Sequence, residues 1–241
     1  MQVEITIPSS LKEVKLKDYQ SLLLIDKPND EDLLKCILNV NSKELGKIKD
    51  KDVVYLKGHI NKLFDKEHEF IPTFNLNGIA YGFIPSLDDI SYGENKDVTS
   101  YINDWGNMHK AMAVLFRPIK LKKNNKYIIE EYEGSHKYSE TMKQMPLDVV
   151  LGAMVFFLQF NQRIAELYTE LFGEGSNEGT DARSNFSRKW GSYSELYTLA
   201  KGDITRFEQV AKLPLHQCLM YLAFEKEKTE LESRMIKSKF K

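Results

Sequence analysis

Apolar residues recur at helical spacing over most of the chain. Val53, Leu56, Ile60, Leu63 and Phe64 share one face at about 3.6 residues per turn, which predicts a helix that starts at Asp50 or Asp52. A short polar side chain that accepts free backbone N–H groups favours the start of a helix. Further helices are therefore predicted from about residue 17, over 31–40, 104–117, 139–144 and 204–211, from Pro146 to about Phe172, and from Pro214.

Strand-like patterns are fewer and shorter. Residues 3–7 alternate apolar and polar positions, and residues 126–132 read as another strand. Asn77-Gly78 lies between two β-type runs, and such a pair readily adopts the positive φ angles of a type I′ turn. The pattern predicts an α+β protein that is mainly helical, with a small antiparallel hairpin or sheet in its N-terminal part.

Residues 173–189 interrupt the apolar pattern. The segment starts with a stretch rich in glycine and polar residues, from Gly173 to Asp181, that offers no apolar anchor. This composition is typical of a flexible linker. We therefore predict an α+β N-terminal domain over 1–172, a linker over 173–189, and a helical C-terminal module over 190–241.

The charge balance argues against a nucleic-acid partner. The 241 residues contain 34 basic and 35 acidic side chains, so the formal net charge is -1. DNA- and RNA-binding domains usually have a basic excess or a basic stripe. The densest basic cluster is a turn that contains Asn124-Asn125, and it is interpreted as a solvated loop tip; its members are Lys120, Lys122, Lys123 and Lys126.

A membrane span and an oxidising compartment are also not expected. The longest apolar run, Val149 to Phe160, is shorter than the roughly 18 residues that a bilayer requires, so we interpret it as a buried core helix. The first residues lack the pattern of a signal peptide. Cys36 and Cys218 each lie in an apolar helical pattern, which favours buried, reduced thiols.

The sequence offers little catalytic chemistry. Glycine-rich phosphate loops and histidine pairs at i, i+4 are absent from it. His68, between Glu67 and Glu69, is interpreted as solvated surface rather than a metal site, and His109 as a satisfied interior or half-exposed histidine rather than a general base. We therefore predict a protein that is not an enzyme and needs neither a cofactor nor a metal.

Aromatic and apolar side chains of the C-terminal module are the candidates for protein binding. Such side chains bury a large area at a low cost in conformational entropy. Tyr81, Phe83 and Trp105 are expected in the core instead. The predicted protein-binding residues are Trp190, Tyr193 and Tyr197, with Leu219, Leu222, Leu231 and Met235 on the last helix.

Two stretches resemble phage proteins. Residues 190–241 resemble the C-terminal extension of tail assembly chaperones from long-tailed phages. Residues 11–160 resemble an uncharacterised phage group from Bacteroidetes-type hosts. The first resemblance is carried by Trp190-Gly191, the run from Tyr193 to Thr205, Val210, Leu213-Pro214-Leu215 and the run from Tyr221 to Lys228; the second by the run from Asn77 to Pro85, Trp105, the run from Met108 to Pro118 and the run from Met145 to Gly152.

The chaperone resemblance implies a function. Tail assembly chaperones bind the apolar, helical tape-measure protein, keep it soluble and help recruit tail-tube subunits. Their extension is often added by a frameshift, which would fall near 173–189 here. The expected place of action is the host cytoplasm, the expected partners are phage structural proteins, and a homo-oligomer is compatible with the sequence. The alternatives are a structural protein of the virion, such as a connector, ring or capsid-associated subunit, and, third, an enzyme or nucleic-acid modifier.

Overall fold

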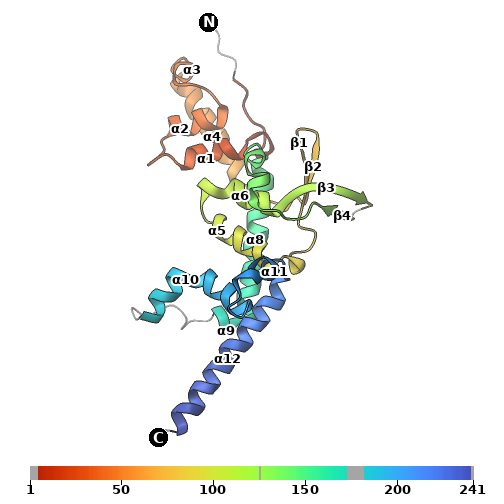
Figure 1. Ribbon diagram of the computed structural model, residues 1–241. Helices are drawn as coiled ribbons and strands as arrows, with labels where there is room; N and C mark the ends of the chain where they lie inside the picture. The colour runs from red at the N-terminus through yellow and green to blue at the C-terminus, as the bar shows by residue number, and fades with distance from the viewer. Residues whose placement is uncertain (1–4, 125, 173–181, 240–241) are drawn as a thin grey trace. The chain divides into compact units, whose positions relative to one another are not determined.

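The computed structural model describes residues 5–124, 126–172 and 182–239 (Figure 1). The chain is mainly helical with one four-stranded antiparallel sheet, so the predicted fold class is confirmed. It divides into two compact units. Unit 1 contains Met1–Pro85 and Val98–Phe156, and unit 2 contains Ser86–Asp97 and Phe157–Lys241. Two helices, α5 (Tyr92–Tyr101) and α8 (Leu147–Leu167), contribute residues to both units.

Two helices of unit 1 start at an asparagine whose side chain caps them. Asn29 accepts a hydrogen bond from the backbone N–H of Asp32, whose carboxylate accepts one from the N–H of Asn29. Asn41 and Glu44 form the same reciprocal pair. Each pair satisfies two backbone donors that the first helical turn leaves free. The helices are α1 (Leu16–Leu23), α2 (Asp30–Leu38), α3 (Ser42–Leu45), α4 (Asp50–Phe64), α6 (Met108–Leu115) and α7 (Ser139–Met142).

The sheet of unit 1 is an antiparallel meander in the order β1-β2-β3-β4. The predicted hairpin is confirmed, because Asn77 (φ 51) and Gly78 (φ 81) both adopt positive φ between paired Leu76 and Ile79. The 126–132 strand is shorter than predicted and ends at Ile129. The strands are β1 (Thr73–Leu76), β2 (Ile79–Phe83), β3 (Phe116–Lys123) and β4 (Lys126–Ile129).

The strand predicted over residues 3–7 does not form in the described part of that segment. Residues 5–7 have no regular secondary structure, and residues 3 and 4 lie outside the described residues. An alternating pattern becomes a strand only when a neighbouring strand accepts its backbone hydrogen bonds. None of the four described strands pairs with this segment.

The core of unit 1 lies against the sheet. Tyr81 and Phe83 are buried as expected, and Phe83 packs edge-on against Phe116 with ring centroids 5.2 Å apart. Trp105 is only half-buried and packs edge-on against Tyr19. Large aromatic side chains bury a large apolar area, so these rings contribute to the stability of the unit together with its aliphatic core.

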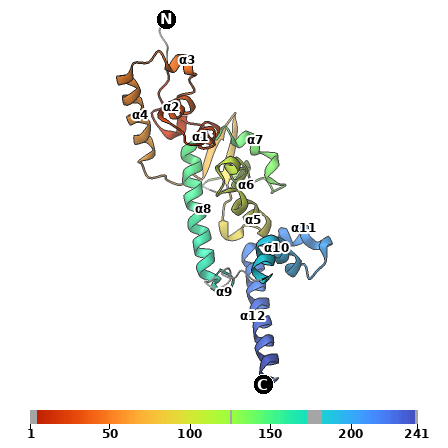
Figure 2. The same cartoon turned by 90° about the vertical axis from the view of Figure 1, so that its left-hand side faces the viewer.

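Unit 2 is built from helices and short turns. The helix predicted from Pro146 to Phe172 is divided at Tyr168 into α8 and the short α9 (Thr169–Phe172). The following elements are α10 (Ala182–Leu199), a 3-10 turn at Ile204–Arg206, α11 (Phe207–Ala211) and α12 (Leu215–Lys239). In Figure 2, α12 extends well past α9, α10 and α11.

The first turn of α5 anchors the start of α12. The N–H of Tyr92 donates to the carbonyl of Leu213 at 2.9 Å, and the N–H of Leu215 donates to the carbonyl of Ile90 at 2.9 Å. The side chains of Ser91 and Glu94 cap α5 reciprocally. Residues 86–97 therefore belong structurally with the C-terminal helices, although about a hundred residues separate them in the sequence.

The predicted domain boundaries differ from these units. Sequence reasoning assigned 86–97 and 157–172 to the N-terminal domain, whereas both segments cluster with α10–α12. Residues 173–181 of the predicted linker lie outside the described residues, and residues 182–189 are the start of α10 rather than a linker. Contacts between segments distant in sequence cannot be read from local composition, which explains the difference.

Among the described residues, α8 alone is long and apolar enough to cross a membrane. Half of its most apolar stretch is buried within the structure. Core helices meet the same criteria of length and composition, so this helix by itself is weak evidence for a span.

Candidate functional site

Three aromatic residues of α10 form one exposed face. Trp190, Tyr193 and Tyr197 follow the i, i+3, i+7 spacing that places side chains on one side of a helix. Their exposed fractions are 42%, 49% and 52%. We call these three residues the aromatic face.

Neighbouring contacts hold the aromatic face in position. The ring of Tyr193 packs edge-on between Trp190 and Phe207 of α11, with centroid separations of 5.8 and 5.5 Å. The ammonium group of Lys189 lies 5.0 Å from the centre of the Trp190 ring. Half-exposed, fixed aromatic rings offer contact area at little entropic cost, so this predicted group is well placed for binding protein.

The helix α10 is anchored through Glu195. Its carboxylate accepts a hydrogen bond from the hydroxyl of Tyr92 and pairs with the ammonium group of Lys96. Tyr92 is buried, and burial together with the Glu195 charge raises the pKa of its hydroxyl well above the ordinary value. Tyr92 therefore remains a protonated donor, and this contact fixes one side of α10 while the aromatic face stays open.

Helix α12 is apolar on two opposite faces. Leu215, Cys218 and Leu219 are buried in unit 2 and Leu222 is half-buried. Leu219, which was predicted as a binding residue, is only 4% exposed, so its side chain belongs to this buried face. It shares the buried face with Leu215 and Cys218, because positions three and four residues apart lie on one side of a helix.

The opposite side of α12 carries an exposed apolar stripe. The stripe consists of Met220, Phe224, Leu231 and Met235, spaced by four, seven and four residues, which keeps them within about 60° of one another around the helix axis. Leu231 and Met235 were predicted as binding residues and are exposed. We call these four residues the α12 stripe.

Sequence reasoning missed Met220 and Phe224. Both are exposed, yet Met220 follows directly after the buried Leu219, and Phe224 lies two residues after the half-buried Leu222. The signal was present, because their spacing to Leu231 and Met235 continues a single helical face. It was obscured by the more continuous apolar run on the buried side.

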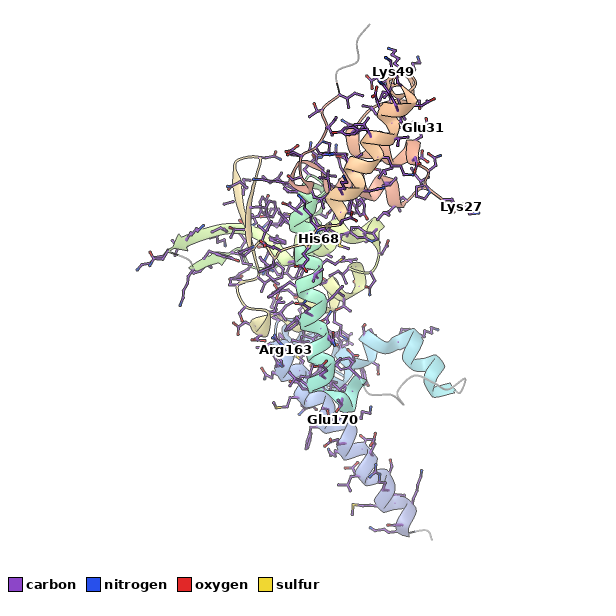
Figure 3. The ribbon with its side chains drawn as sticks, turned by 180° about the vertical axis from the view of Figure 1, so that it is seen from behind. Lys27, Glu31, Lys49, His68, Arg163 and Glu170 are labelled. Atoms are coloured by element: carbon purple, nitrogen blue, oxygen red, sulfur yellow. The ribbon has the colours of Figure 1, made fainter. Side chains whose placement is uncertain are left out.

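Contacts from Tyr168 and α9 leave the α12 stripe open. Tyr168 Oη lies 3.1 Å from Nδ1 of His216 and donates to the backbone carbonyl of His216 at 3.2 Å. The ammonium group of Lys226 donates to the carbonyl of Glu170, which Figure 3 labels. His216 and Lys226 lie on other sides of the helix than the stripe. From residue 227 to 239 every side chain of α12 is exposed.

The remaining chemical candidates are distributed through the fold. His68, labelled in Figure 3, is half-buried between the exposed Glu67 and Glu69. In the described part of the chain, no cluster of three or more His, Cys, Asp or Glu side chains could hold a metal ion. His109 is buried, its Nδ1 lies 3.1 Å from Nε2 of Gln20, and desolvation lowers its pKa. This is the satisfied interior histidine that was predicted.

The predicted basic cluster is exposed. Lys120, Lys122, Lys123 and Lys126 lie exposed on β3 and β4. The carboxylate of the exposed Asp88 forms an ion pair with the guanidinium of Arg163, with 3.2 Å between Oδ1 and Nη2. Of the two cysteines, Cys218 is buried as predicted and Cys36 is half-exposed. The open apolar surface of α10 and α12 thus remains the strongest candidate site.

No family model, curated protein or solved structure matches this chain.

Proposed function

We propose that this protein is a phage tail assembly chaperone that binds the tape-measure protein and recruits tail-tube subunits in the host cytoplasm. Support comes from the resemblance of residues 190–241 to the extension of such chaperones. The observation that carries the proposal is the aromatic face of α10, on which three half-exposed rings lie on one side of the helix. Exposed apolar patches of this kind commonly mark protein-binding surfaces.

The aromatic face suits an apolar helical client. A tape-measure protein presents long apolar helical stretches that aggregate when they have no partner. Rings that are half-exposed and held by Phe207 and Lys189 can cover such stretches without first becoming ordered. Pre-ordered contact residues reduce the entropic cost of binding.

Co-expression tests the proposal. We expect the tape-measure protein of the same phage to be insoluble alone and soluble when expressed with this chain. The two proteins should then co-purify on an affinity tag carried by either partner. An insoluble tape-measure protein with no recovered complex would refute the proposal.

The second candidate function is a structural subunit of the virion, such as a connector, ring or capsid-associated protein. The projecting α12 is also suited to a permanent contact within an assembled particle. Quantitative mass spectrometry of purified particles separates the two functions. A chaperone is expected to be absent from mature virions or present only in traces, whereas a structural subunit would be present in fixed stoichiometry.

A further inference from the structure

The exposed part of α12 lacks a partner within the described part of the chain. Residues 227–239 are all exposed, and Leu231 and Met235 of the α12 stripe lie among them. An isolated helix gains little stability in water from propensity alone. A narrow apolar stripe on such a helix is the pattern by which helices pair along a seam.

The charges that border the stripe are arranged in two pairs of opposite sign. Glu227 and Arg234 are seven residues apart and therefore lie along the same border. Lys228 and Glu232 are four residues apart and lie along the other border. All four are exposed. The positions of these four charges along α12 restrict how a second helix can lie against the stripe.

In a parallel copy of α12 each border faces the other border of the second helix, so Glu227 lies nearest Lys228 and Arg234 nearest Glu232. In an antiparallel copy each border faces the same border of the second helix, so Glu227 faces Arg234 on one border and Lys228 faces Glu232 on the other. The charges are therefore satisfied in either orientation, and the opposed helix dipoles favour the antiparallel one.

We propose that α12 pairs with α12 of a second copy of this chain, antiparallel and centred close to Leu231. In a two-fold interface, if residue i contacts residue j, then j contacts i. Leu231 then packs against its own copy, and Phe224 packs against Met235 of the second copy at both ends. All three apolar side chains of the seam are exposed in the single chain.

The apolar and charged contacts independently require the same register. The pairs Phe224 with Met235, Glu227 with Arg234, and Lys228 with Glu232 all have midpoints between residues 229 and 231. The resulting overlap runs from about residue 222 to residue 239, roughly 27 Å of helix. This is the part of α12 that lies beyond its buried start, so the second helix meets open surface.

The interface is small, so the dimer should form with a Kd in about the micromolar range. Sedimentation velocity of the purified full chain from about 1 to 100 μM is expected to show a reversible monomer–dimer equilibrium. A monomer throughout that range would overturn the proposal. The measurement contains no tape-measure protein, so its outcome is independent of the proposed function.

Leu231 and Ile236 offer a matched pair of variants. Both are 58% exposed, but Leu231 lies on the seam and Ile236 on the opposite side of α12. Leu231→Asp should weaken dimerisation by at least about tenfold, because a buried carboxylate without a partner opposes association. Ile236→Asp should leave it unchanged, with equal helix content of both variants by circular dichroism. An equal change of the dimer dissociation constant in the two variants would contradict the placement of Leu231 at the centre of the interface.

Charge exchange tests the orientation. Glu227→Arg and Arg234→Glu should each weaken the dimer by about tenfold or more at low salt, because each converts two attractive contacts into repulsive ones. The double variant E227R/R234E should restore the wild-type dissociation constant, since every contact is then attractive again. A double variant as weak as the single ones would exclude the antiparallel register.

Discussion

At the scale of single residues, Leu219 and Met220 show how sharply a helix divides its environments. They are neighbours in the sequence, yet Leu219 is buried in unit 2 and Met220 is exposed. One step along a helix turns a side chain by about 100°, which is enough to move it from the core to solvent. Whether an apolar side chain of α12 is open to a partner therefore depends on which of the two faces it belongs to.

The two cysteines should differ in reactivity. Cys218 is buried, which raises the pKa of its thiol to about 11. At pH 8 only about one thiol in a thousand is then the reactive thiolate. Cys36 is half-exposed, with a pKa raised by desolvation first and by nearby carboxylates second. We expect a thiol reagent to modify Cys36 slowly in the native protein and Cys218 only after unfolding.

The Cys36→Ser variant is the control for this experiment. Rapid native-state labelling that survives the substitution would show that Cys218 is accessible.

The raised pKa of Cys218 also has a consequence for stability. Because the pKa of Cys218 is higher in the folded than in the unfolded chain, the buried thiol stabilises the fold below about pH 8.5, and this contribution is lost as the pH rises toward 11.

At the scale of elements, local patterns predicted most helices and the hairpin. The Asn77-Gly78 turn and the cap at Asn29 depend only on adjacent residues, so the sequence contains the whole signal. The strand predicted over residues 3–7 does not form over its described residues 5–7, because a strand needs a partner that can come from anywhere in the chain. For the candidate site, Trp190, Tyr193 and Tyr197 are exposed as the composition indicated, whereas Leu219 lies on the buried face of α12.

Glu195 is the element-scale contact to test. Glu195→Ala removes the acceptor of the buried Tyr92 hydroxyl and the partner of Lys96, and should lower the unfolding free energy by about 1–3 kcal/mol. Glu208→Ala, an exposed substitution on α11, is the control and should change stability little. Chemical denaturation measures both. Equal stability of the two variants would show that Glu195 does not anchor α10.

At the scale of the whole molecule, the division into units could not be predicted from composition. The backbone hydrogen bonds between residues 90–92 and 213–215 join segments more than a hundred residues apart. A break in local composition at 173–189 marks where the apolar pattern stops, but it does not show which earlier segments pack with the last helices. Unit 2 is consequently built from two separate parts of the sequence.

Truncation distinguishes these units from the domains that composition suggested. Removing residues 190–241 should leave the sheet of unit 1 folded, because its strands pair among themselves. Residues 86–97 should lose protection from hydrogen exchange, since their partners Leu213 and Leu215 are gone. Hydrogen exchange measured by mass spectrometry compares both regions with the full chain. Unchanged protection of residues 86–97 from hydrogen exchange would contradict their assignment to unit 2.

The central claim is that unit 2 binds an apolar client through the aromatic face. The most direct test is the fraction of tape-measure protein that remains soluble when it is co-expressed with the wild-type chain, with W190S/Y197S, or with Tyr55→Ser, which alters an exposed tyrosine of unit 1. We predict that the double variant loses most of the solubilised protein while Tyr55→Ser retains it. Equal solubility with all three chains would contradict the claim.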